Sequence, residues 1–196
     1  GGLYLATTGF GTRLPGVRLS MSQIRDGDAI LVSGTVGDHG AAVMLAREDF
    51  GLRGALLSDA ACVFELTKAM MKFDGIRFMR DPTRGGIASV AHEIARARSC
   101  GVRFDEEIPV QEQVQSVCDM LGFDPLYLAC EGRVVAVIAP GQADEALAAW
   151  QAIPGGRQAA RIGHIVADEK RVILTTSLGG ERFLEELEDD PLPRIC

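Results

Sequence analysis

The amino-acid sequence predicts an α+β domain. The run AILVSG (29–34) is apolar and ends at glycine, which is typical of a buried strand. Farther along, Ile87, Val90 and Ile94 keep the spacing of one face of an amphipathic helix. Strand-like and helix-like segments of this kind are mixed along the 196 residues and do not alternate strictly. This mixture favours α+β layers over a doubly wound parallel sheet.

Helices are expected where apolar residues recur at helical spacing behind a turn. The first begins at the turn GDHG, where Asp38 is a natural N-cap. The others cover roughly 60–73, the segment after DPTRGG, 110–121 and 143–150.

Strands are expected where short apolar runs lie between turn residues. Besides 29–34, single strands are expected over 75–80 and 102–104. Two more are expected within 126–140 (LYLACEGRVVAVIAP), joined by a tight turn at Glu131 and Gly132. A closing strand pair is expected from ARIGHIV (160–166) and RVILTT (171–176).

The C-terminal segment predicts a short helix followed by an extended arm. ERFLEELEDD (181–190) starts as a helix, but its acidic residues crowd the end where the helix dipole is negative. Pro191 and Pro193 then prevent the helix from continuing. We therefore expect residues 189–196 to leave the body as an arm, which at about 3.3 Å per residue could reach on the order of 25 Å.

Composition excludes several classes of protein. The net charge of -7 argues against a nucleic-acid partner, because neutralising phosphates needs a basic face. The lysines and arginines are scattered, so no run of them indicates an anionic membrane surface. No apolar run approaches the roughly 18 residues needed to span a bilayer, and GGLYLATTGFG lacks the features of a signal peptide. The first residues are typical of a sequence that begins in the middle of a strand.

The five cysteines indicate a reducing cytoplasm. Their number is odd, none are spaced as CxxC, and none lies beside a histidine at metal-ligand spacing. Cys62 and Cys118 fall in apolar-periodic helical segments and Cys100 falls just before a strand, so we expect all of the cysteines except the last to be structural.

Two glycine-rich loops are candidate phosphate sites. In DPTRGG (81–86), Thr83 offers a hydroxyl, and Gly85 and Gly86 let the backbone approach a ligand at the start of a helix. A helix-capping turn with Asp81 as acceptor explains the same residues equally well. SGTVGDHG (33–40) is a second such loop, but it lacks the ending of a P-loop. His39 on its own is more often a surface or cap histidine than a catalytic one.

Two side chains are candidates for chemistry. Glu131 lies at a turn beside a glycine, where a carboxylate can act as a general base, although a solvated turn residue is the more common outcome. Cys196 is the last residue, after the prolines and Arg194. Its thiol belongs either to a poorly ordered terminal residue without a function or to a nucleophile on a stiffened arm that visits more than one site.

Four segments, SGTVGDHGAAVMLARE, DPTRGG, DPLYLACEGR and the terminal PRIC, resemble the HypE family of hydrogenase maturation proteins, the carbamoyl dehydratases. The resemblance runs along essentially the whole chain, and the family belongs to the superfamily of aminoimidazole ribonucleotide (AIR) synthetase and selenophosphate synthetase. It implies a three-layer α-β-α domain like the C-terminal domain of AIR synthetase. Residues 1–20 would be the last strand and linker of an N-terminal ATP-binding domain, 21–186 the C-terminal domain, and 187–196 a mobile tail.

The resemblance also implies a reaction. The partner HypF carbamoylates the thiol of Cys196, ATP phosphorylates the carboxamide oxygen, and loss of the amide protons and of phosphate gives a thiocyanate. The cyano group then passes to iron held by a HypC–HypD complex. Glu131 would be the base, and the nucleotide or thiocarboxamide pocket would be lined by Asp38, His39, Gly40, Asp81, Thr83, Gly85 and Gly86.

The same resemblance implies ATP with Mg²⁺, whose ligands we expect in the N-terminal domain, so no metal ligand is assigned in this chain. It implies a homodimer for the full-length protein and little activity for this chain alone. Two alternatives stay open. One is another ATP-dependent enzyme of the same superfamily, and the other is a non-catalytic docking module whose tail binds a partner.

Overall fold

Seven strands form one mixed sheet in the computed structural model, which describes residues 6–12, 15–47, 56–105, 107–176 and 178–187. The strand order is β2-β4-β1-β5-β3-β6-β7, and every neighbouring pair is antiparallel except β3 with β6. The strands are β1 (Ala29–Val32), β2 (Ile76–Arg80), β3 (Gly101–Phe104), β4 (Val135–Ile138), β5 (Ala160–Val166), β6 (Val172–Thr175) and β7 (Glu181–Phe183).

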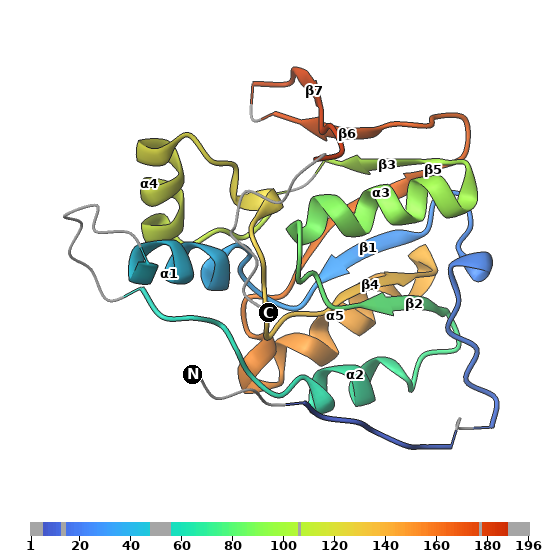
Figure 1. Ribbon diagram of the computed structural model, residues 1–196. Coiled ribbons are helices and arrows are strands. Elements are labelled where there is room, and N and C mark those ends of the chain that lie inside the picture. The colour runs from blue at the N-terminus through green and yellow to red at the C-terminus, as the bar shows by residue number, and fades with distance from the viewer. Residues whose placement is uncertain (1–5, 13–14, 48–55, 106, 177, 188–196) are drawn as a thin grey trace.

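Helices cover both faces of this sheet (Figure 1). The α-helices are α1 (Asp38–Arg47), α2 (Phe64–Met70), α3 (Gly86–Arg98), α4 (Glu112–Leu121) and α5 (Ala143–Gln151). Short 3-10 turns are η1 (Met21–Gln23), η2 (Pro125–Tyr127), η3 (Pro140–Gln142) and η4 (Pro154–Gly156). None of the helices in the described part of the chain is long and apolar enough to cross a membrane.

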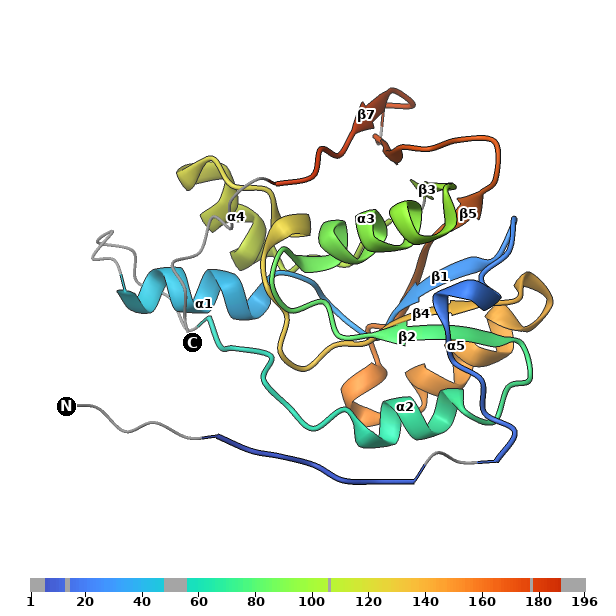
Figure 2. The same ribbon diagram turned by 45° about the vertical axis from the view of Figure 1, so that its right-hand side comes forward.

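Alternation along the strands makes two separate cores. In β1, Ile30 and Val32 pack with the apolar face of α3, whereas Ala29 and Leu31 pack with α2 and α5 on the opposite face. Figures 1 and 2 both show α3 on one side of the sheet and α2 with α5 on the other. The chain therefore folds as α+β in three layers, as predicted.

Helices α1 and α4 lie beyond one end of the sheet and share a small third core (Figure 2). Ala41 and Met44 of α1 pack there against Val114 and Cys118 of α4. Because this pair holds the start of α1 in place, it fixes the loop that joins β1 to α1.

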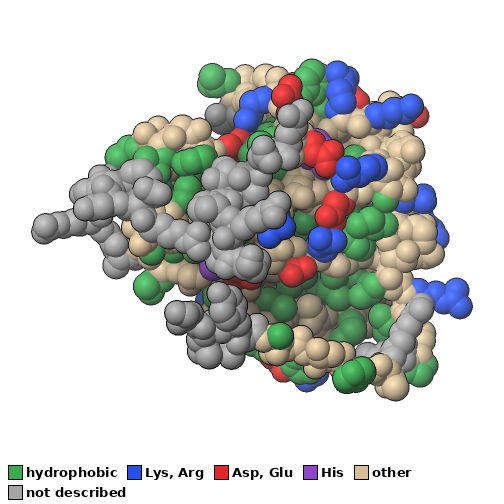
Figure 3. Space-filling model, in the orientation of Figure 1, with side chains coloured by type: hydrophobic (Ala, Val, Ile, Leu, Met, Phe, Trp, Pro, Cys, Tyr) green, Lys and Arg blue, Asp and Glu red, His purple; other side chains and the backbone are tan. Residues whose placement is uncertain are grey.

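Acidic and basic side chains of the described residues are interspersed over α3 on the face shown in Figure 3. Ion pairs among the described residues involve this helix: Arg80 lies 2.8 Å from Glu93, and Arg96 lies 3.0 Å from Glu186. This arrangement gives no continuous basic surface on the described part of that face, which agrees with the net charge of -7.

The prediction of two strands within 126–140 was half wrong. The second strand is β4, but the segment before it forms η2 and then runs without regular structure. Its apolar residues are buried by different partners, because Leu126 packs in the α3 core and Leu128 in the α1–α4 core. Its backbone bonds to neighbouring loops in place of a strand.

The closing strand pair was also predicted wrongly. Both strands exist as β5 and β6, but β3 lies between them and pairs with each. Val102 is opposite Ile165 on β5 and opposite Val172 on β6. All three of these side chains are buried in the α3 core, and this burial favours the arrangement over a simple hairpin.

The segment from 181 forms strand β7, not the start of a helix. It pairs with β6, and the Arg171 guanidinium lies 4.1 Å from the centre of the Phe183 ring. Residues 6–11, expected within the final strand GGLYLATTGFG of a preceding domain, are exposed and outside any strand, so this part of the prediction was wrong. The predicted arm over 189–196, including Cys196, lies outside the described residues, so the boundaries of the three predicted segments stay predictions.

Candidate functional site

Four loops meet at one end of the sheet. The amide of Gly40 donates to the Ala129 carbonyl at 3.0 Å, and the amide of Cys130 donates to the Pro82 carbonyl at 3.0 Å. These bonds bring together segments that are far apart in sequence: 33–40, 58–61, 81–86 and 128–133. All of the described site residues predicted from the sequence lie on three of these loops.

Arg133 links these loops through its guanidinium. It donates from Nε to the Thr35 carbonyl at 2.9 Å, and from Nη2 to both Thr35 Oγ1 and Asp38 Oδ2 at 3.1 Å. The Nε atom also lies 3.5 Å from Asp59 Oδ2. The side chains of Asp38 and Asp59 are 1% and 0% exposed, so both charges are buried.

Two buried carboxylates therefore share one guanidinium. Within the part of the chain that the structure describes, Asp38 Oδ1 and Asp59 Oδ2 are buried without a hydrogen-bond partner. Removing one member of such a group leaves an uncompensated buried charge, which is strongly destabilising. The three side chains therefore hold the loops together as a unit.

Asp38 was predicted to be the N-cap of its helix, and the structure gives it a different position. It is the first residue of α1, and its carboxylate accepts the hydroxyl of Thr35 as well as the Arg133 bond. His39 follows it, with Nδ1 2.8 Å from the hydroxyl oxygen of Ser58. That contact joins the loop 33–40 to the segment that carries Asp59.

The loop 81–86 feeds directly into α3. Gly85 is the N-cap in the left-handed region at φ 72°, and Gly86 follows at φ 59°. Asp81 is exposed and pairs with Arg80, so the capping role considered for it is not seen. Thr83 is half-buried, and its carbonyl accepts the Gly86 amide at 3.0 Å. The positive end of α3 is thus left facing this loop.

Gly86 is required here by both backbone angle and space. A Cβ built on it would lie 2.4 Å from the Leu126 carbonyl oxygen and 2.7 Å from that of Leu128. We expect Gly86→Ala to lower the free energy of unfolding by about 2 kcal/mol or more. Urea unfolding would measure this. Gly141→Ala is the matched control, because nothing lies within 4 Å of its Cβ position; an equal loss in both would contradict the argument.

Glu131 has a fixed backbone and an exposed side chain. Its amide donates to Asp59 Oδ1 at 3.0 Å, while its carboxylate faces solvent at the meeting point of the loops. An exposed carboxylate on a fixed backbone can accept a proton from a bound substrate. The structure thus brings Glu131 and the loops 33–40 and 81–86 to one end of the sheet, and a pocket lined by all three stays a prediction.

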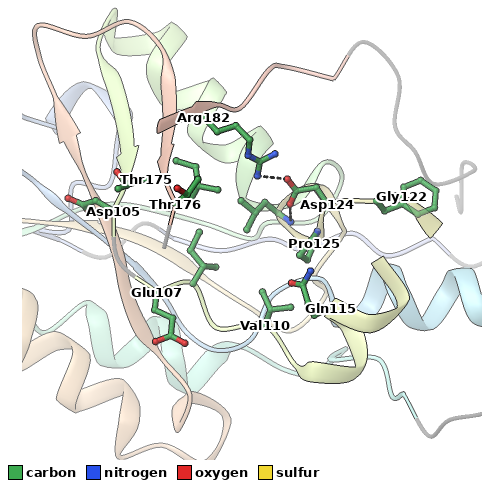
Figure 4. Close-up of a pocket in the computed structure, with 14 residues that line it drawn as sticks. Asp105, Glu107, Val110, Gln115, Gly122, Asp124, Pro125, Thr175, Thr176 and Arg182 are labelled. Atoms are coloured by element: carbon green, nitrogen blue, oxygen red, sulfur yellow. Dashed lines mark hydrogen bonds and ion pairs between the residues drawn. The ribbon is translucent and has the colours of Figure 1, made fainter. Parts of the chain in front are cut away.

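A large cavity among the described residues lies elsewhere. It has a volume of about 930 Å³ and is lined by 14 residues (Figure 4). Three of these residues, Asp105, Glu107 and Asp124, carry carboxylates. The guanidinium of Arg182 donates to Asp124 at 2.7 Å and is thereby partly neutralised. Carboxylates repel phosphate, and no predicted site residue lines this cavity. It is therefore a poor nucleotide site.

The last described residues lie beside the loop 81–86. Leu187 lines a cavity of about 190 Å³ together with Arg84 and Gly85. The segment before it is held in place, because the Tyr127 hydroxyl donates to the Glu185 carbonyl at 2.8 Å. Nine residues separate Leu187 from the C-terminus (196 minus 187), which is at most about 30 Å of extended chain.

The thiols of the described residues differ in accessibility. Burial raises the pKa of the Cys130 thiol to about 12 and that of Cys118 to about 11, and it also raises the pKa of Cys100. Cys62 was expected in a helix, but it precedes α2 and is exposed.

We therefore expect iodoacetamide at pH 8 to label Cys62 at least tenfold faster than Cys100, Cys118 and Cys130, because alkylation needs an accessible thiolate. Peptide mass spectrometry over time would measure the rates, with urea-unfolded protein as the control in which all four react. Comparable rates in the folded protein would contradict the burial.

Among the described residues, no three His, Cys, Asp or Glu side chains lie close enough together to hold a metal ion. The residues present therefore do not fit a metal site, and no step is assigned to a metal bound by this part of the chain.

Known proteins were compared with the chain. The family model "AIR synthase related protein, C-terminal domain" matches residues 25–175. The carbamoyl dehydratase HypE of Rhizobium leguminosarum bv. viciae is 46% identical over 199 residues, covering 100% of this chain and 57% of that protein. The chain thus spans less than two thirds of the length of the curated relatives it matches.

Solved structures of HypE proteins are also similar to the chain. The crystal structure of E. coli HypE has a TM-score of 0.87 at 40% identity, covering 92% of this chain and 56% of that chain. A HypE–HypF complex has a TM-score of 0.83 at 38% identity, covering 88% and 57%. A HypE structure in complex with ATP has a TM-score of 0.79 at 37% identity, covering 88% and 54%.

Proposed function

The chain belongs to the AIR synthase related C-terminal domain family and is similar over its whole length to HypE carbamoyl dehydratases, and on this premise we propose that it dehydrates a carbamoyl group carried on Cys196. The product is a thiocyanate whose cyano group becomes a ligand of iron in a [NiFe] hydrogenase. The proposal concerns the full-length protein, meaning this chain together with the N-terminal part that its relatives carry.

The proposed reaction consumes one ATP for each carbamoyl group. The thiocarbamate oxygen attacks the γ-phosphorus and ADP leaves. One N–H proton is then lost to give a phosphorylated imidate. Loss of the second N–H proton, with cleavage of the C–O bond, releases phosphate and forms the C≡N bond. Sulfur keeps its bond to carbon throughout, so the sum is thiocarbamate plus ATP giving thiocyanate, ADP, phosphate and a proton.

The position of Glu131 is the observation that carries this proposal. Its carboxylate is exposed where the loops 33–40, 81–86 and 128–133 meet, and its backbone is held by Asp59. Deprotonating an amide nitrogen needs a base within hydrogen-bond reach, and a carboxylate at this point can serve. We assign Glu131 the removal of an N–H proton.

The glycine loops are proposed to hold the phosphates or the thiocarboxamide. Gly85 and Gly86 place the positive end of α3 at the loop, where a phosphate group is favoured. Asp81 and Thr83 would line the same pocket. His39 and Gly40 would line its opposite side, and the buried Asp38 would hold that side in place through Arg133.

The reach of the chain supports Cys196 as the carrier. Leu187 lies beside Gly85, and the remaining nine residues can span at most about 30 Å. That length is enough for the thiol to visit the candidate site and then a partner protein. We propose HypF as the carbamoyl donor, supported by the similar HypE–HypF complex, and HypC–HypD as the cyano acceptor.

We further propose that ATP binds with Mg²⁺ held by ligands outside this chain, supported for ATP by the similar HypE–ATP structure. A homodimer and a cytoplasmic location are part of the same proposal. The location rests on the odd cysteine count and the absence of CxxC pairs in the sequence.

Mass spectrometry of the C-terminal peptide tests the proposal. After incubation of the full-length protein with HypF, carbamoyl phosphate and ATP, the peptide should gain the mass of a carbamoyl group and then lose the mass of water. A peptide that never gains the carbamoyl mass would overturn the carrier role. One that gains it but keeps it when ATP is in excess would overturn the dehydratase role.

A further inference from the structure

We propose that Asp59 is a positioning residue that fixes Glu131 for proton removal, an inference that rests on the proposed function. Asp59 lies in a loop 72 residues before Glu131, and no motif in the sequence marks it. Its carboxylate does not reach solvent, so it acts through Glu131 and not on a substrate.

The first contact of this arrangement is a hydrogen bond. Asp59 Oδ1 accepts the amide of Glu131 at 3.0 Å, and the Asp59 side chain is fully buried. Because this amide belongs to the residue that carries the proposed base, the bond fixes the point from which the carboxylate extends. An ionised acceptor makes such a bond shorter and stronger than a neutral one.

The second contact is backbone against backbone. A Cβ built on Gly132 would lie 1.9 Å from the Asp59 carbonyl oxygen and 2.9 Å from the Ala61 amide. The segments 59–61 and 131–133 therefore lie too close together for a side chain at position 132. Only glycine at 132 permits this approach, and any added side chain would push Glu131 away from Asp59.

The third contact connects the pair to the rest of the site. Asp59 Oδ2 lies 3.5 Å from Arg133 Nε, and Arg133 bonds Asp38 and Thr35 of the loop 33–40. One oxygen of Asp59 thus lies beside the Arg133 guanidinium that it shares with Asp38, while its other oxygen accepts the Glu131 amide. An asparagine at 59 could serve one of these neighbours with its oxygen but would turn its NH₂ group toward the other, which is also a donor.

Two variants of the full-length protein test the inference, one by changing a charge and the other by moving the backbone. Asp59→Asn removes the charge and keeps the size, whereas Gly132→Ala keeps the charge and displaces the backbone. Both should slow single-turnover, ATP-dependent water loss by about 10- to 100-fold, because a displacement of about 1 Å at a catalytic group can cost that much. Carbamoylation of Cys196 by HypF should stay within about twofold of the wild type, since it does not depend on the place of Glu131.

Asp168→Asn, in the exposed turn after β5, is the matched control and should react at the wild-type rate. The double variant Asp59→Asn with Glu131→Gln should be no slower than Glu131→Gln alone, because a residue that acts only by placing the base loses its effect when the base is gone.

Three results would overturn the inference. The first is a wild-type rate of water loss in both folded variants, and the second is an equal fall in carbamoylation, ATP affinity and the rate of water loss. The third is a double variant in which the rate losses of the two single variants multiply. A different result would overturn the proposed function itself. If Glu131→Gln alone dehydrates at the wild-type rate, Glu131 is not the base. If Glu131→Gln stalls while Asp59→Asn and Gly132→Ala do not, only the positioning role is lost.

Discussion

Replacing Cys196 with alanine is expected to abolish all turnover by the full-length protein. The side chain of alanine has no nucleophile, so no carbamoyl group can be attached and no thiocyanate can form. Incubation of the C196A protein with HypF, carbamoyl phosphate and ATP should leave the mass of the C-terminal peptide unchanged. In cells, the hydrogenase should lack its cyanide ligands, which infrared spectroscopy of the iron site would show.

Cys62→Ala is the matched control, because Cys62 is the exposed thiol among the described residues. It should carbamoylate and dehydrate as the wild type does, which separates the loss of one particular thiol from the loss of any accessible thiol. Full hydrogenase maturation by C196A would exclude the carrier role. It would favour either another ATP-dependent enzyme of the superfamily, which has no need of this cysteine, or a docking module.

Glu131→Gln is expected to leave carbamoylation of Cys196 intact and to slow the ATP-dependent loss of water by about 10²- to 10⁴-fold, the usual effect of removing a general base. Glutamine has the same shape but cannot take up a proton at neutral pH. The backbone bond from residue 131 to Asp59 is kept, so the site should not be displaced. The carbamoylated peptide should accumulate, and a rapid-quench mass measurement would give the rate.

Glu145→Gln, at an exposed position in the first turn of α5, provides the control for a change of charge far from the site. It should dehydrate at the wild-type rate. Unchanged water loss in Glu131→Gln would count directly against the base assignment, and loss of carbamoylation in the same variant would indicate a docking defect in place of a chemical one.

The expected results for Cys196 and Glu131 separate two steps of one reaction. C196A stops the sequence before any group is attached, whereas E131Q stops it with the group attached and not yet dehydrated. A protein in which both variants accumulate the same species would not follow the proposed order. Comparing the two peptides by mass therefore tests the order of steps as well as the residues.

Local patterns were enough to predict most of the elements. The apolar run of β1 and the helical spacing of α3 depend on neighbours within a few residues, and both formed as predicted. The glycine loop 81–86 was also visible, because its glycines mark it locally, whereas the predicted tight turn between two strands at Glu131 did not form. The segment before Glu131 misled, since its apolar residues are buried by two different cores and not by a sheet.

Asp59 and Arg133 were missed as site residues. Arg133 stands directly after the glutamate and glycine of ACEGR and shortly before a buried strand, so a charged residue at that point was a usable signal. Asp59 carries no such signal, because nothing in its own neighbourhood shows that it will be buried or which amide it will accept.

What the sequence determined by itself is the α+β class, the order of most helices and strands, the glycine loops and two candidate reactive residues. Only the tertiary structure decided the strand order, with β3 between β5 and β6, and the meeting of Asp59 with Glu131 across 72 residues. The physical reason is range. Periodicity and turn chemistry act over a few residues, whereas strand pairing and the burial of a shared charge are decided by contacts between segments that the sequence keeps far apart.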